Sequence, residues 1–387
     1  MTVASRNWVK RNLGFDPIHT PPPPATFATT AAAATRAEPE DFQREIIDFD
    51  SEGLEGAAFF TFSTATGLSR FTDIPWPTNL APKADAIARK VSSGALPKAE
   101  VLVVTWTVDE GHALSRVLTP GKDSRNDYVS YTHNFARISK KMRNGCPALN
   151  AKRLGAYWTG TIAGKRVVYF KSDSHLSQDT KVAPKAGETL PNQDLWQQII
   201  DEVQPNMVIT TGTAGGIGTD CEVGDVVISP IVTFDCQKWL SAEPFKTESF
   251  KSASPNTKLL AKARQLFKAN AERLPPDNKR PPKIIRARSG PTSVLTTDFF
   301  GFDTSKDSYH LQGKGSVSEM GDAVLGLTES QATSPVQWLA VRNVSDPQIK
   351  SEGTLKQQAN VAAQIYKGYG RWSSVCSAIV CWALIAA

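Results

Sequence analysis

The stretch Val208-Ile209-Thr210-Thr211-Gly212-Thr213-Ala214-Gly215-Gly216 lies near the middle of the 387-residue chain. Its first half is apolar and β-branched, which is typical of a buried strand. Three glycines follow within five residues, and glycine lets the backbone turn sharply or lie close to a ligand. Short glycine motifs also form tight turns that bind nothing. The stretch therefore predicts a buried strand that ends in a glycine loop, either a ligand cradle or a plain turn.

Strand and helix patterns alternate on both sides of this stretch. Residues 101–106 form a second buried-strand run, and residues 191–203 place apolar side chains on one helical face. Residues 153–162 and 165–171 alternate around Ala163-Gly164, which predicts a hairpin. Further helices are expected at residues 81–91, 109–114, 257–271, 321–333 and 355–387, the last of them broken near Gly368 and Gly370. Further strands are expected at residues 57–62, 284–289, 293–297 and 336–344. Residues 121–151 are expected to form a loop or an inserted helix.

This alternation predicts an α/β fold in a single large domain. We expect a mixed, partly parallel central sheet with helices on both faces. Residues 1–45 contain Pro21 to Pro24 and Ala-Thr repeats, which bury too little apolar surface to fold, so a disordered Pro/Ala-rich arm is expected. Residues 46–98 are expected to form an N-terminal extension, and residues 99–387 the catalytic domain.

The composition excludes several classes of protein. Hydrophobic residues make up 40% and charged residues 21% of the chain, as in ordinary soluble globular proteins. The five cysteines and five histidines are scattered without a CxxC pair, so we expect no metal, no organic cofactor and a cytoplasmic location. A net charge of +6 mildly favours small anions, but no nucleic-acid-binding motif is present. Residues 373–387 are apolar but too few to span a bilayer comfortably. They predict a final core helix, and no association with a membrane is expected.

Chemically useful side chains follow several of the expected strands. Glu110 comes just after the strand 101–106, the glycine loop ends the central strand, and Ser345-Asp346 follow the strand 336–344. A further polar segment, Ser318 to Asp322, precedes the helix at 321–333. Open α/β sheets bind ligands at the carboxyl ends of their strands. We therefore expect these segments to converge on one sheet edge.

Together these segments resemble the nucleoside phosphorylase and nucleosidase superfamily, and most closely its methylthioadenosine/S-adenosylhomocysteine nucleosidases. Residues 208–230 (VITTGTAGGIGTDCEVGDVVISP) are similar to the family's strand, glycine loop and "VGDIVVS" continuation. Residues 342–346 (RNVSD) look like its "RAISD", and residues 294–300 (VLTTDFF) like its purine-stacking segment. The resemblance runs from about Val101 to the carboxyl end. It implies the superfamily's fold, cleavage of a purine N-glycosidic bond, and a homo-oligomer.

The resemblance implies two catalytic carboxyl groups. Asp346, oriented by Ser345, matches the acid that protonates the five-membered ring of the departing purine. Glu110 matches the carboxylate that positions the attacking water on the far side of the sugar. From the residues alone, Asp346 could instead cap a helix before Pro347, and Glu110 could be a first-turn glutamate beside a helix dipole.

The same resemblance implies a set of substrate contacts. Phe300 is expected to stack on the base, although Phe299 or a core role for both is also open. Two departures affect the sugar end: Gly321 stands at the second glutamate of the family's "EMEA", and Asp173-Ser174-His175 at its Gly-Ile-Gly. Glu319 or Asp322 is then expected to hold the ribose. The residues expected to contact substrate are Thr211, Gly212, Thr213, Ala214, Gly215, Phe300, Glu319, Met320, Asp322, Ser345 and His175.

Charge favours water over phosphate as the nucleophile. Similar phosphorylases carry an arginine where this chain has Thr210, and a glycine/arginine motif where it has residues 107–110 with two acids. Hydrolysis of a purine nucleoside or nucleotide is therefore expected. Three alternatives stay open: a phosphorylase that binds phosphate through basic residues of 125–143, a binding module without turnover, and an effector that depletes nucleotides. The same basic residues, together with Lys171, could instead bind a 5′-phosphate of the substrate.

Overall fold

The computed structural model describes eleven ranges of the chain, and the expectations for the arm at 1–45, the strand at 57–62 and Phe299 and Phe300 lie outside them. The described residues are 74–87, 90–122, 127–144, 146–176, 188–217, 221–268, 278–287, 292–298, 310–311, 313–346 and 355–387.

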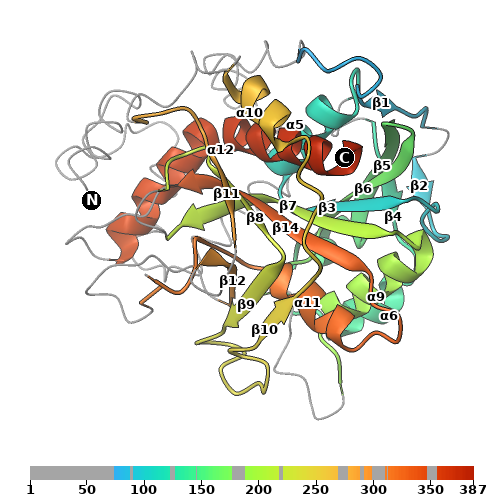
Figure 1. Cartoon of the computed structure of the whole chain (residues 1–387). Coiled ribbons are helices and arrows are strands. Elements are labelled where there is room, and N and C mark those ends of the chain that lie inside the picture. Colours follow the sequence, from blue (N-terminus) through green and yellow to red (C-terminus); the bar gives the residue numbers. More distant parts are fainter. Residues whose placement is uncertain are drawn as a thin grey trace, which may run out of the picture.

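A mixed central sheet organises these residues (Figure 1). Its strands are β1 (Lys83–Ala84), β2 (Val91–Ser92), β3 (Val101–Thr105), β4 (Val129–Tyr131), β5 (Gly155–Ile162), β6 (Lys165–Ser172), β7 (Met207–Gly216), β8 (Val226–Ser229), β9 (Ile231–Asp235), β10 (Ser249–Lys251), β11 (Ile284–Arg286), β12 (Val294–Thr297), β13 (Val317–Glu319) and β14 (Gln337–Asp346). They follow the order β10-β9-β12-β13-β7-β3-β6-β5-β4-β2, with β14 beside β7 and β8, β11 beside β8, and β1 beside β5.

Helices cover both faces of this sheet (Figure 1). They are α5 (Val108–Leu118), α6 (Phe135–Ile138), η2 (Ser139–Lys141), α7 (Pro147–Ala151), α9 (Pro191–Val203), α10 (Leu260–Lys268), α11 (Asp322–Ser330) and α12 (Leu355–Ala386). One apolar cluster joins α5, α10 and α12 to the sheet, and a second joins α9 and α11 to the opposite face. The predicted fold, a mixed sheet between two helical layers, is confirmed.

Strand β7 is buried from both sides. Val208 contributes to the α9 side of the core and Ile209 to the α12 side, and both side chains are fully buried. Successive side chains of a strand point to opposite faces, so a strand covered on both faces has an unbroken apolar sequence. This confirms the buried strand expected from Val208, but the expected glycine loop was wrong, because residues 212–216 continue the strand and pair with β14 and β13.

Local signals located several other elements well. Strands β5 and β6 pair antiparallel around Ala163 and Gly164, which both have positive φ, as a two-residue hairpin turn requires. The helix expected at residues 191–203 is α9, which has the same bounds.

Two segment expectations were wrong, and one was incomplete. Residues 81–91 do not form a helix, because 83–84 pair with β5 and Val91 begins β2. The terminal helix is not broken near Gly368 and Gly370, since α12 continues to Ala386 and a helical glycine costs only about 1 kcal/mol. The segment 121–151 contains β4, α6, η2 and α7. In the described part of the chain, no helix is long and apolar enough to cross a membrane.

Candidate active site at the end of strand β7

Strand β7 changes its neighbour partway along one edge. Residues Met207 to Thr210 pair with β3, whereas Gly215 and Gly216 pair with β13 in the opposite direction. The other edge of β7 pairs with β14 as far as Gly215. On the first edge, the backbone N–H of Thr213 donates to a side chain, the Glu110 carboxylate, at 2.7 Å. Ligands of α/β sheets bind where neighbouring strands diverge in this way.

Glu110 fills this gap between the strands. It is the third residue of α5, where it forms a capping box with Thr107. Its Oε2 accepts hydrogen bonds from Thr105 Oγ1 (2.8 Å), Trp106 N (3.0 Å) and Thr107 N (2.9 Å). Its Oε1 accepts from the N–H (2.7 Å) and the hydroxyl (2.6 Å) of Thr213. The carboxylate therefore connects the end of β3 to the end of β7.

The surroundings of Glu110 keep it ionised. Burial alone would raise the pKa of this carboxyl group, but the charge of Arg342 and the hydrogen bonds from Thr213 and Thr107 outweigh burial and lower it. Gly212 permits this close approach: its φ is +152°, and a Cβ there would lie 2.5 Å from Glu110 Cδ. A glycine at this position is thus required by the carboxylate beside it.

Asp346 occupies the end of β14, opposite Gly215. The pairing register shifts between Val344 and Asp346, which marks an irregularity at this point of the strand. Ser345 Oγ donates to Asp346 Oδ1 at 2.8 Å, and a Cβ on Gly215 would lie 3.3 Å from Asp346 Oδ2. Burial raises the pKa of Asp346 to about 6, although the Ser345 hydrogen bond acts in the opposite direction. The helix-cap alternative depends on Pro347, which lies outside the described residues.

The two carboxyl groups therefore approach the same strand end. Glu110 lies against Gly212 and Asp346 lies against Gly215. The two contacts are three residues apart along β7, which is roughly 10 Å in an extended strand.

A buried ionic cluster lies beside Glu110. Arg342 Nε donates to Asp322 Oδ2 at 2.8 Å, its Nη2 donates to Asp322 Oδ1, and the same Nη2 donates to Glu319 Oε2 at 3.2 Å. Glu319 also accepts from the N–H groups of Gly321 (2.6 Å) and Asp322 (3.0 Å). Burial and the charge of Asp322 raise the pKa of Glu319 to about 8, against the effect of Arg342. Glu319 therefore holds a proton more readily than an ordinary carboxyl group, and Arg342 and Asp322 form a buried ion pair.

Trp106 completes this cluster on its other side. The Arg342 guanidinium stacks over the indole at 4.4 Å, and a Cβ on Gly321 would lie 2.9 Å from Trp106 Cζ2. The rings of Trp196 and His175 both lie 6.4 Å away. Trp106 thus occupies the space into which a side chain at position 321 would project.

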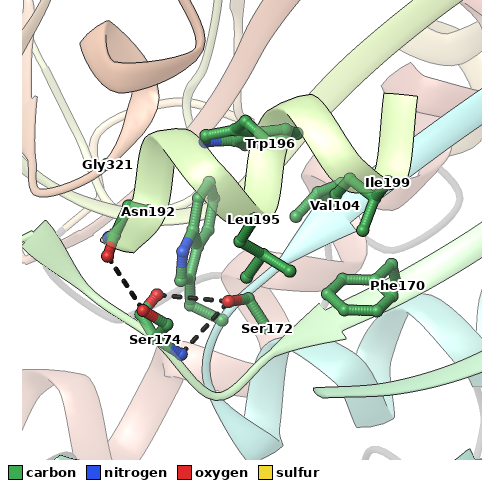
Figure 2. Close-up of a pocket in the computed structure, with 10 residues that line it drawn as sticks. Val104, Phe170, Ser172, Ser174, Asn192, Leu195, Trp196, Ile199 and Gly321 are labelled. Atoms are coloured by element: carbon green, nitrogen blue, oxygen red, sulfur yellow. Dashed lines mark hydrogen bonds between the residues drawn. The ribbon is translucent and has the colours of Figure 1, made fainter. Parts of the chain in front are cut away.

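Trp106 also lines a small cavity, together with residues of α9 such as Asn192 and Trp196 (Figure 2). Its volume of about 10 Å³ is room for about one water molecule. Polar groups on one wall bond to one another: Ser174 Oγ donates to Asn192 Oδ1 at 2.9 Å, and Ser174 N donates to Ser172 Oγ at 3.1 Å (Figure 2). This void is too small for a nucleoside.

The remaining expected contacts lie in several places. Thr211 is next to the Cys381 thiol of α12, so its hydroxyl faces the terminal helix. The carbonyl of Ala214 accepts a 3.4 Å hydrogen bond from Ser345 Oγ. The carbonyl of Met320 accepts from Leu176 N at 3.3 Å. Burial lowers the pKa of His175 to about 4, so its ring is neutral near pH 7.

The segment expected to receive a phosphate is already paired. Lys171 and Arg153 both donate to Asp173, the latter at 2.6 Å. Burial alone would raise the pKa of Asp173, but these two cations hold it below its ordinary value. In the basic segment, Lys141 contacts Asp194 at 2.6 Å, and Arg125 lies outside the described residues.

Sequence reasoning missed two residues of this site. Trp106 ends an apolar strand run, and nothing in the sequence pattern distinguishes it from an ordinary core residue. Arg342 was noticed only within the RNVSD segment, because its partners lie 20 and 23 positions upstream. The glycine at position 321 was the available signal for a bulky neighbour.

Comparison with known proteins gives the following matches. Residues 130–369 match the family model described as the phosphorylase superfamily. A 5′-methylthioadenosine/S-adenosylhomocysteine nucleosidase of Listeria innocua is 34% identical over 90 residues, which are 23% of this chain and 33% of that protein. The chain spans about a third of the length of the curated relatives it matches.

Two solved structures are also similar. The 5′-methylthioadenosine/S-adenosylhomocysteine nucleosidase of Neisseria meningitidis, in complex with methylthio-immucillin-A, is 18% identical with a TM-score of 0.45, covering 74% of this chain and 98% of that one. The futalosine hydrolase of Helicobacter pylori is 13% identical with a TM-score of 0.43, covering 73% and 96%.

Proposed function

The chain belongs to the phosphorylase superfamily, and we propose that it hydrolyses the N-glycosidic bond of a purine nucleoside or nucleotide, releasing free base and the ribose moiety. One observation carries this proposal. Two buried carboxyl groups flank the end of β7, and their surroundings move their pKa values in opposite directions: Glu110 down, Asp346 up to about 6. Such a divided pair is how enzyme sites separate a base from an acid.

In the proposed reaction, Asp346 donates its proton to the five-membered ring of the purine. The C1′–N bond breaks with its electron pair moving to the base, and a water oxygen attacks C1′ from the opposite side. Glu110 accepts the proton that this water loses. A carboxylate has about four lone-pair sites, and Glu110 already accepts five hydrogen bonds. The Thr213 hydroxyl, which can rotate, is the donor that the water would replace.

The charges at this edge support water as the nucleophile. A phosphate dianion needs cations with free donors, preferably arginine. Arg342 is shared between Asp322 and Glu319, and Lys171 and Arg153 are paired with Asp173. A phosphate ion would have to break one of these ion pairs and approach Glu110.

The experiment is a product assay. The protein is incubated with adenosine, methylthioadenosine, AMP and ATP, with and without phosphate, and free base and sugar products are separated by chromatography. We expect phosphate-independent base release and free sugar, lost in Asp346→Asn and kept in the exposed control Asp201→Asn. Release that strictly requires phosphate would make the chain a phosphorylase. No release from any purine nucleoside or nucleotide would reject the proposal.

A second candidate is a binding module without turnover. Trp106 fills the space beside Gly321, where the resemblance places a ribose-binding glutamate. This candidate predicts that a purine nucleoside binds tightly, that no base is released, and that Asp346→Asn leaves the affinity unchanged. Calorimetry combined with the product assay separates the two.

We also propose that the chain acts in the cytoplasm as a homo-oligomer, with residues 99–387 as its catalytic domain. Support for the oligomer comes from the superfamily resemblance. Light scattering measures the assembly directly. A monomer at the concentration used for the activity assay would reject it.

A further inference from the structure

The His175 side chain lies buried beyond the carboxyl end of β6. Because β6 runs parallel to β3, its carboxyl end lies on the same sheet edge as Glu110. His175 is 9% exposed, and within the described part of the chain neither of its ring nitrogens forms a hydrogen bond. Neither nitrogen is fully enclosed, so a water molecule can reach the ring. In a folded protein, such a polar group is normally satisfied by water or by a ligand.

The nearest features of the candidate site are Trp106 and Glu110. The ring centroids of His175 and Trp106 lie 6.4 Å apart, and the backbone N–H of Trp106 donates to Glu110 Oε2 at 3.0 Å. Burial has the largest effect on the pKa of His175 and lowers it; among the charged groups, Glu110 has the largest effect, ahead of Lys171 and Arg342. Charge effects weaken with distance, which indicates that the Glu110 carboxylate lies close to the imidazole.

The imidazole has the hydrogen-bonding groups that a water on Glu110 lacks. A water molecule that replaces the Thr213 hydroxyl donates one O–H to Glu110 and has a second O–H to place. Burial lowers the pKa of His175 to about 4, so the ring is neutral near pH 7. A neutral imidazole has one donor N–H and one acceptor nitrogen, and the acceptor can take this second O–H.

We propose that His175 is a positioning residue for the attacking water, whose second O–H it accepts while Glu110 accepts the first. This rests on the proposed function, since it concerns the nucleophile of that hydrolysis. The proton donated to Glu110 is the one that the water loses on attack at C1′. The O–H held by His175 stays on the oxygen and becomes the hydroxyl on C1′ of the free sugar. His175 stands where the resemblance gives the nucleosidases a glycine, so this contact is a departure of this chain from their pattern.

The test uses methanol as a competing nucleophile. Methanol has a single O–H, so it can donate to Glu110 but not also to His175. The protein and its His175→Ala variant are incubated in aqueous methanol with the purine nucleoside or nucleotide that is cleaved fastest, and methyl glycoside and free sugar are separated by chromatography. In His175→Ala we expect kcat to fall about tenfold, as the loss of one hydrogen bond implies, and the ratio of methyl glycoside to free sugar to rise more than about threefold. The control His133→Ala, at a histidine that contacts Glu202 near the end of α9, should leave both unchanged.

Further variants separate the positioning of water from packing. At least one of His175→Gln and His175→Asn, which keep an acceptor oxygen, should recover the original product ratio, and recovery in neither overturns the inference. If circular dichroism shows that His175→Ala does not fold, His175→Phe, which keeps a ring without an acceptor, must show the raised ratio. An unchanged ratio in the folded variant overturns the inference and leaves the proposed function intact. If the unmodified protein releases no base, the proposed function and this inference both fail.

Discussion

Replacing Asp346 by asparagine tests both the energetics and the chemistry of the site. Burial raises the pKa of Asp346 from its ordinary value of 3.8 to about 6, so its ionised form is disfavoured in the folded protein. A shift of about two pKa units corresponds to roughly 3 kcal/mol. Because the folded-state pKa is the higher one, this group's stabilising contribution is complete below the unfolded pKa and is lost as pH rises through about 6.

Asp346→Asn removes this penalty because the amide does not ionise. We expect the variant and the original protein to unfold with similar free energies near pH 4, and the variant to be more stable by up to about 3 kcal/mol near pH 8. Urea unfolding at both pH values measures the difference. A variant that is equally or less stable near pH 8 would show that burial does not disfavour this carboxylate.

In Asp346→Asn, activity should move in the opposite direction to stability. If protonated Asp346 is the acid, base release falls as pH rises above about 6 and is lost in Asp346→Asn. Ser345→Ala removes the hydrogen bond that favours the carboxylate, so the falling limb should move to higher pH. A limb that stays in place after Ser345→Ala, or activity that survives in Asp346→Asn, would exclude Asp346 as the acid.

Two further predictions concern the surroundings of the carboxyl pair. Gly212→Ala places a Cβ 2.5 Å from Glu110 Cδ, at a φ of +152°. We expect the free energy of unfolding to fall by about 3–5 kcal/mol, because the backbone is strained and hydrogen bonds of Glu110 are displaced. The control Gly94→Ala has open space around its Cβ and should change the free energy of unfolding, measured in urea, by less than about 1 kcal/mol. Arg342→Lys loses a bidentate ion pair, so we expect the free energy of unfolding to fall by about 2–4 kcal/mol. The control Arg166→Lys changes an exposed ion pair and should lower the free energy of unfolding by less than about 1 kcal/mol. Equal effects at the two positions would contradict the role given to the buried cluster.

Sequence patterns located elements whose signals are local. The hairpin turn at Ala163-Gly164, the apolar face of α9 and the apolar run of β7 each depend on neighbouring residues, and each lies where it was expected. The expected helix at 81–91 failed because 83–84 pair with residues far along the chain, in β5. Short strands such as β13 are likewise defined by their partners, so three residues of sequence carry little signal.

In the candidate site, too, local motifs could be predicted from the sequence, whereas contacts between distant residues could not. Glycine and acid positions were visible as motifs, and the contacts of Gly212 with Glu110 and of Gly215 with Asp346 give a physical reason for both glycines. Side-chain direction was not visible. Thr211 faces Cys381 because strand geometry, and not residue type, sets its side.

The change of neighbour along β7 divides the sheet into two parts that both pair with this strand. The part containing β3 and β6 pairs with the first residues of β7, and the part containing β13 and β12 pairs with its last two residues. Between these two pairing regions, no strand of the described chain joins the two parts. At the candidate site the two parts are therefore joined by individual contacts and not by a strand ladder: Thr213 N donates to Glu110, and Leu176 N donates to the Met320 carbonyl.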